Sequence, residues 1–125
     1  MAKAEENLAC AESEFASGRY NSCANRCYYA CYQAAIAALL RANVRPRNPD
    51  GRWGHEYVHA AFDGILIARR KLYPSSLRNV LTNTRLLREL ADYKPEPVKQ
   101  REVDRVLRQG REFVQAVRKA GGKHR

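Results

Sequence analysis

The sequence lacks any apolar run close to the roughly 20 residues that a membrane-spanning helix needs, so we expect no membrane association. It also lacks a sustained alternation of β-branched and polar residues, which excludes a protein built on strands. The first residues, MAKAEENLAC, contain one lysine, two glutamates and no apolar core, so we expect no secretory signal and a cytoplasmic location. Repeats and low-complexity stretches are absent as well. These absences favour a single helical domain over residues 1–125.

Cysteine is scarce, with four residues in 125, which excludes a disulfide-stapled scaffold. Three of the four, Cys23, Cys27 and Cys31, follow one another at four-residue spacing in CANRCYYACYQA. At about 100° per residue they share one helical stripe with alanines. Free cysteine packs as a small apolar residue, whereas structural zinc sites usually take cysteines from a loop. We therefore interpret them as core residues and predict no metal and no other cofactor.

Acidic residues are few: 13 aspartates and glutamates stand against 23 lysines and arginines, for a net charge of +10. The charge is unevenly distributed, because residues 1–16 hold four glutamates and residues 99–125 hold nine basic side chains. A basic surface rich in arginine suits RNA, a nucleotide or an acidic protein partner. The alternative is a solvated basic surface without a dedicated ligand.

Glycine and proline cluster in three short stretches, and the segments between them show the three- and four-residue spacing of amphipathic helices. We predict five helices, with the fourth capped by Ser75 or Ser76 and the fifth beginning near Pro97. A basic, flexible tail is expected at 121–125. The predicted helices span about 3–16, 20–42, 53–72, 76–92 and 97–120.

Two histidines in GHEYVHAAF, His55 and His59, match the H-E-x-x-H pattern of zinc hydrolases. Such enzymes take a third ligand from further along the chain, and no suitably spaced ligand follows here. Apolar residues run beside both histidines, which favours a packed or partner-facing pair. A zinc hydrolase is therefore the third functional hypothesis.

The segment TRLLRELADY places Arg88 near the centre of an apolar stripe, where a leucine would be expected. A buried arginine is costly unless it is paired, and Asp92 follows one turn later. Two interpretations stay open. In one, the two residues form an ion pair that orients the end of the helix. In the other, they are a polar site that lines a groove, with Tyr93 at its mouth and Arg85 on the same side.

The pieces RCYYACYQAA, GHEYVHAAF and RELADY, followed by a long amphipathic helix, resemble the HEPN domain family over about residues 4–120. The likeness is closest to the small stand-alone branch with an R-x-x-x-D-Y motif. It implies an all-α fold, an up-and-down antiparallel four-helix bundle with an additional short helix, usually as a homodimer. It also implies a minimal nucleotidyltransferase as the partner, in a toxin–antitoxin or defence system.

Many HEPN proteins are metal-independent ribonucleases with an R-x4–6-H motif. Arg88 matches the arginine, but Tyr93 stands where a histidine would be. We therefore expect a module that binds RNA, a nucleotide or its partner, with a metal-independent endoribonuclease toxin as the alternative. The resemblance also implies that Tyr93 can be adenylylated. The candidate residues are Arg88, Asp92 and Tyr93 for catalysis, and Arg26, Arg85 and His55 for binding.

Overall fold

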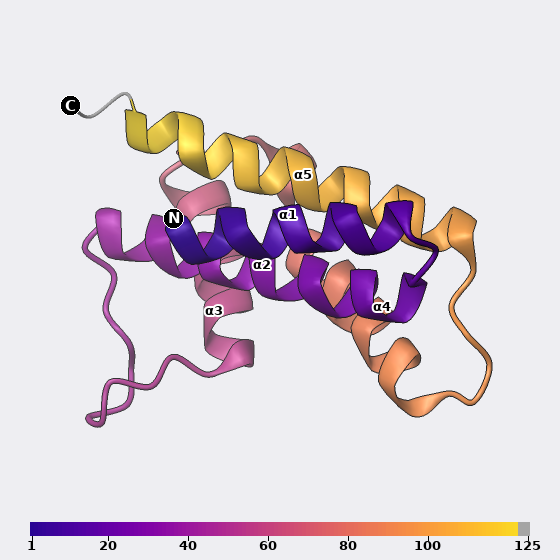
Figure 1. Cartoon of the computed structure of the whole chain (residues 1–125). Helices are drawn as coiled ribbons and strands as arrows, with labels where there is room; N and C mark the ends of the chain where they lie inside the picture. Colours follow the sequence, from indigo (N-terminus) through magenta and orange to yellow (C-terminus); the bar gives the residue numbers. More distant parts are fainter. Residues whose placement is uncertain (123–125) are drawn as a thin grey trace.

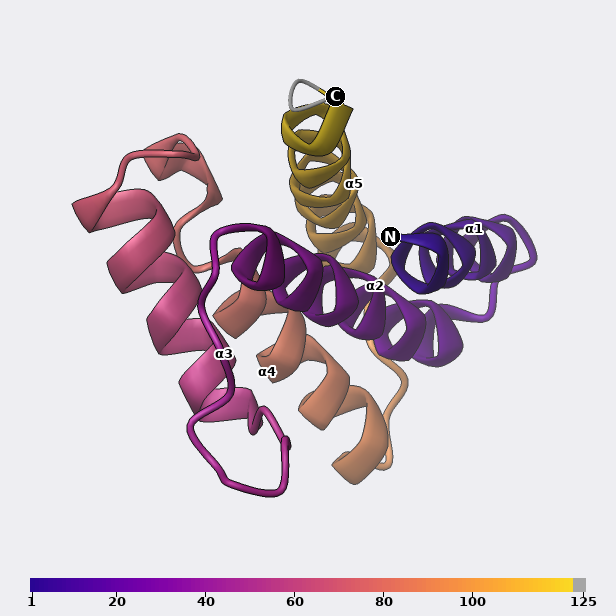
Figure 2. The ribbon, with the colours of Figure 1, turned by 90° about the vertical axis from the view of Figure 1, so that its left-hand side faces the viewer.

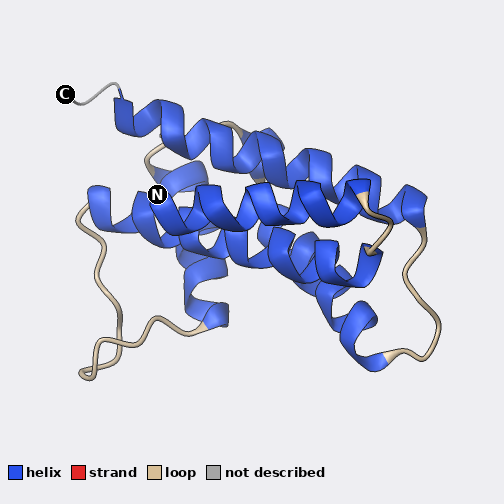
Figure 3. Cartoon of the chain, viewed as in Figure 1, coloured by secondary structure: helices blue, strands red, loops and turns tan. Residues whose placement is uncertain are grey.

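The computed structural model describes residues 1–122, and within this range the chain forms helices and no strand (Figure 3). No helix in the described range is both long and apolar enough to cross a membrane. The last helix continues through Gly122, so the first two residues of the predicted tail are helical; the rest of the predicted tail lies outside the described residues. The elements are α1 (Ala2–Ala16), α2 (Tyr20–Arg41), α3 (His55–Ala61), a π-helix η1 (Phe62–Arg69), a 3₁₀ turn η2 (Ser75–Leu77), α4 (Val80–Tyr93) and α5 (Gln100–Gly122).

The predicted all-α bundle is confirmed, with α2 at its centre (Figure 1). In Figure 2, where α2 is seen obliquely, α5, α1 and α4 lie around it, while α3 and η1 cross beside it. α1 and α2 run in opposite directions because only a short turn joins them. This arrangement brings α2, α3 and α4 together on the side away from α1.

Because several helices pack against α2, its fully buried residues cover about half of its circumference, which is wider than one narrow stripe. Cys23, Cys27 and Cys31 are each at most 1% exposed, which confirms that they are core residues. Burial raises the pKa of the Cys23 thiol to about 12, so this thiol stays protonated and packs as a small apolar group. The buried residues of α2 are Cys23, Ala24, Cys27, Tyr28, Ala30, Cys31, Ala34, Ala35, Ala38 and Leu39.

α5 approaches α2 closely at Gly110. A methyl group placed on this residue would lie 2.5 Å from the Cys27 Sγ and 3.3 Å from the Cys31 Sγ, so only glycine allows the contact without a shift. The Cys31 thiol also points at the Gly110 carbonyl oxygen, with 3.9 Å between the two atoms. Small residues on both helices therefore set the distance between them.

The acidic α1 lies along the basic α5, and ion pairs join them. Arg111 Nε contacts Glu12 Oε1 at 2.6 Å, and Arg118 Nε contacts Glu5 Oε1 at 3.4 Å. Part of the charge asymmetry seen in the sequence is thus neutralised within the fold. The net charge alone does not locate a ligand site.

The single helix predicted over 53–72 is in fact an α-helix followed by a π-helix, in which each N–H bonds the carbonyl five residues earlier. The wider turn brings residues five apart onto one face. Phe62, Leu66 and Ile67 are therefore all buried, whereas α-helical geometry would turn Ile67 away from Phe62. The periodicity of the sequence does not reveal this change.

Two predicted helix starts were wrong. Ser75 begins a 3₁₀ turn rather than capping α4, which starts after Asn79, a residue in the left-handed region with φ 70°. α5 starts at Gln100 rather than near Pro97. The Val98 N–H, which would lie in the first turn of a helix that began at Pro97, is instead donated to the Asn21 side chain at 3.1 Å.

Candidate arginine–histidine site

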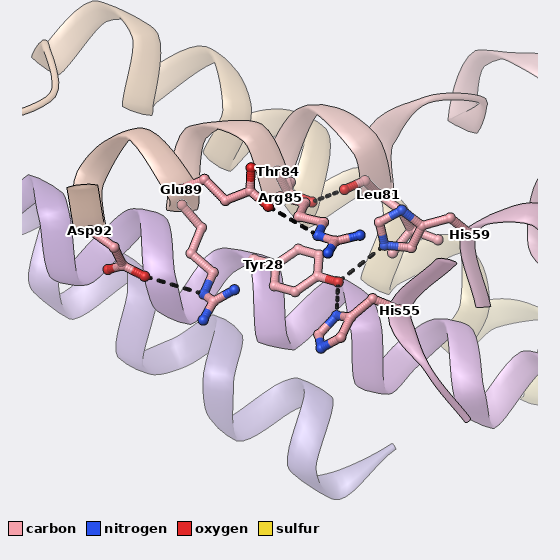
Figure 4. Close-up of polar contacts among 9 residues, drawn as sticks. Tyr28, His55, His59, Leu81, Thr84, Arg85, Glu89 and Asp92 are labelled. Carbon is pink, nitrogen blue, oxygen red and sulfur yellow. Dashed lines mark hydrogen bonds and ion pairs between the residues drawn. The ribbon is translucent and has the colours of Figure 1, made fainter. Parts of the chain in front are cut away.

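Tyr28 lies where α2, α3 and α4 meet, and its hydroxyl joins two histidines (Figure 4). Its oxygen forms hydrogen bonds with His55 Nδ1 and, at 3.0 Å, with His59 Nε2. A phenol has one proton, so it donates to one imidazole and accepts an N–H from the other. The two histidines face α2 together because they are four residues apart on α3. The tyrosine thereby fixes the orientation of both rings.

Both imidazoles are uncharged at neutral pH. Burial, then the Arg85 guanidinium, then His55 lower the pKa of His59 from 6.5 to about 4. Burial is also the main cause of the lowered pKa of His55, with Arg85 and Arg88 adding to it. His55 stacks on Tyr32, with 4.5 Å between the ring centroids. Neutral imidazoles that are partly exposed can accept a proton or a hydrogen bond from a ligand.

Two arginines of α4 face this group. The Arg88 guanidinium lies 5.2 Å from the Tyr29 ring centroid and 5.8 Å from that of Tyr28. Arg88 Nε is 3.6 Å from Asp92 Oδ2, and Arg85 Nε is 3.2 Å from a carboxylate oxygen one turn further along. Neither contact has hydrogen-bond geometry, so both buried Nε atoms lack a hydrogen bond within the described residues. The guanidinium groups are held in place but incompletely satisfied, as at an anion site.

Tyr28, His55, His59, Arg85 and Arg88 are called the arginine–histidine cluster below. Arg88 lies within the angular range of the buried stripe of α4, since at 100° per residue it is only about 20° from Leu81. Its side chain is nevertheless 25% exposed, whereas Leu87 on the same stripe is 5% exposed. Arg88 is therefore partly buried at the edge of the core.

The other candidates are placed as follows. The ion pair between Arg88 and Asp92 is present. His55 and Arg85 belong to the same cluster, in which the Arg85 guanidinium contributes to the lowered pKa of His55. Tyr93 is 82% exposed at the end of α4, and within the described residues no hydrogen bond connects it to the cluster. Arg26 is exposed and donates to the Asn7 side chain of α1 at 3.3 Å. The structure thus brings four of the six candidate residues together and leaves Tyr93 and Arg26 outside.

Sequence reasoning missed the role of Tyr28, and it treated His59 as one of a packed or partner-facing pair, or as a zinc ligand, but not as a member of this site. The available signal was a tyrosine among the cysteines and alanines on the buried side of this helix. Among residues 1–122, no group of three or more histidine, cysteine or acidic side chains is placed to hold a metal. Within this described range the zinc hydrolase hypothesis therefore has no third ligand.

Comparison with known proteins agrees with the resemblance noted in the sequence. The protein-family model described as the HEPN domain matches residues 1–120. A search of curated proteins found no match to the chain.

Proposed function

The chain belongs to the HEPN domain family, and we propose that it binds the phosphate groups of RNA or of a nucleotide at the arginine–histidine cluster. The family is associated with nucleotide- or RNA-related functions, often in toxin or defence systems. One observation carries the proposal: two guanidinium groups lie beside two uncharged imidazoles. A phosphate would accept charge-assisted hydrogen bonds from the two arginines. On the side of the imidazoles it would not have to displace a carboxylate.

The same side chains also support ribonuclease activity as the second candidate. A neutral imidazole can remove the proton of a ribose 2′-hydroxyl, whose oxygen then attacks the neighbouring phosphorus as the 5′-oxygen leaves. Arg85 and Arg88 would stabilise the charge that develops on the phosphate oxygens. The histidine missing after Arg88 in the sequence would be replaced by His55 or His59, which the fold brings to it from α3.

Binding is tested with a labelled single-stranded RNA, with chelator present, on the parent and on the double variant Arg85→Gln/Arg88→Gln. Removal of two guanidinium groups that bind phosphate should weaken binding by roughly tenfold or more. The slope of log affinity against log salt should become shallower by about 0.7 for each phosphate that the variant leaves unneutralised. Cleavage in the same samples, absent from the variant, would favour the ribonuclease.

The matched control is Arg101→Gln/Arg105→Gln, which removes two exposed arginines of α5 and changes the net charge equally. If both double variants weaken binding by the same factor, binding depends on overall charge and not on the cluster. If the parent binds no RNA and no nucleotide, the proposal is wrong.

We also propose the homodimer and the nucleotidyltransferase partner in a cytoplasmic toxin–antitoxin or defence system. Leu86 and Leu90 are 53% and 40% exposed on α4, at the spacing of one helical face, which supports a protein contact there. The 82% exposure of Tyr93 supports its adenylylation. Mass spectrometry of the protein from its native cells should detect AMP on a peptide that contains Tyr93; an unmodified peptide in every sample would contradict this.

A further inference from the structure

The loop between α2 and α3 carries exposed arginines and the only tryptophan of the chain. Its one acidic residue, Asp50, pairs with Arg52, whose Nε lies 3.0 Å from Asp50 Oδ2. Arg45 and Arg47 are exposed, and within the described residues no carboxylate forms an ion pair with either of them. The loop therefore presents unneutralised positive charge to solvent.

Residues of this loop contact Tyr57, which lies on α3. The Trp53 ring is nearly parallel to that of Tyr57, with 6.3 Å between centroids and 23° between planes. The Arg47 guanidinium lies 5.5 Å from the Tyr57 centroid. The Tyr57 hydroxyl donates to the Arg45 carbonyl oxygen at 2.9 Å. Tyr57 thus fixes the Trp53 ring, the Arg47 guanidinium and the backbone of Arg45, whose own guanidinium donates to the Leu40 carbonyl oxygen at 3.5 Å. The patch is therefore preformed, which lowers the entropy cost of binding a ligand there.

We propose that this loop patch, formed by Arg45, Arg47, Trp53 and Tyr57, binds single-stranded RNA by stacking an unpaired base on Trp53. Arg45 and Arg47 contact the adjacent phosphates. Alternation of aromatic and arginine side chains is how single strands are bound, because every base has a face that can stack. Bases within a duplex have their faces covered by their neighbours, so this patch discriminates against duplex RNA.

The loop patch and the arginine–histidine cluster share the first turns of α3, where Tyr57 lies between His55 and His59 in the sequence. Trp53 is two residues from His55, so their Cα atoms are at most about 7 Å apart. An extended strand can therefore place a phosphate at the cluster and a neighbouring base on Trp53. The inference rests on the proposed function for the phosphate contact, and it adds that the ligand is an unpaired RNA strand.

Because Trp53 is the one tryptophan of the chain, tryptophan fluorescence reports on the loop patch alone. The full chain is titrated with a single-stranded RNA, with a duplex of the same sequence and with an abasic sugar–phosphate oligomer; binding is followed separately by anisotropy. The single strand should quench Trp53, whereas the abasic oligomer should bind without quenching. The duplex should bind more weakly than the single strand.

Trp53→Leu should weaken binding of the single strand by about tenfold and leave binding of the abasic oligomer unchanged. Trp53→Phe, which keeps a stacking ring, should retain most of the affinity. If the single strand binds without changing Trp53 fluorescence, or if Trp53→Leu weakens both ligands equally, the loop patch is not a base site. The proposed function then still stands. If no oligomer binds at all, both proposals are overturned.

Discussion

His59 should make the stability of this protein depend on pH. Its imidazole bonds the Tyr28 hydroxyl, and burial together with Arg85 lowers its pKa from 6.5 to about 4. In the unfolded chain the same imidazole takes up a proton near pH 6.5. Between these two values the unfolded state binds more protons than the folded state. Stability is therefore fully present above pH 6.5 and is lost as the pH falls toward 4.

The size of this decrease in stability follows from the two pKa values. They differ by 6.5 − 4, or about 2.5 pH units, and each unit corresponds to about 1.4 kcal/mol. Integration predicts a decrease of roughly 2 kcal/mol by pH 5 and roughly 3 kcal/mol by pH 4. The imidazole is partly exposed, so screening by water reduces the effect, and these two decreases in stability are upper limits. Even half of this decrease is a large fraction of the stability of a small domain.

The assay is urea unfolding at pH 7 and pH 5, for the parent and for His59→Gln. Glutamine can still bond the Tyr28 hydroxyl but does not titrate, so the variant should lose much less stability on acidification. Comparing the two proteins cancels other groups, including Asp63, whose pKa burial raises and which therefore acts in the opposite direction. An equal decrease in stability in both proteins would refute the reasoning.

Two further predictions concern the contact between α2 and α5 and the exposed face of α4. Gly110→Ala should destabilise the fold by about 1 kcal/mol or more, since overpacking against Cys27 outweighs the better helix propensity of alanine. Adding Cys27→Ala should recover part of that stability in a urea double-mutant cycle; purely additive costs would argue against the contact. Leu86→Glu/Leu90→Glu should convert a homodimer to a monomer in analytical ultracentrifugation, and a monomeric parent would rule the dimer out.

The sequence by itself was sufficient for the helices and for most of the core. Three- and four-residue spacing locates amphipathic helices because it depends only on helix geometry. It placed Cys23, Cys27 and Cys31 in the core correctly, and it identified the ion pair between Arg88 and Asp92. Residues so close in the chain meet whenever the helix forms. The wrong helix starts fell at loop residues, where Asn79 adopts a left-handed conformation that local spacing does not encode.

Only the tertiary structure decided which side chains form the candidate site. Tyr28 is separated from His55 and His59 by 27 and 31 residues, and α3 must pack on α2 before they touch. The lowered pKa of His59 depends in turn on Arg85, which reaches it from α4. Periodicity within one helix says nothing about the face that another helix covers. Arg85, Arg88 and His55 were therefore candidates from the sequence, whereas Tyr28, His59 and the contacts among these residues became visible only in the fold.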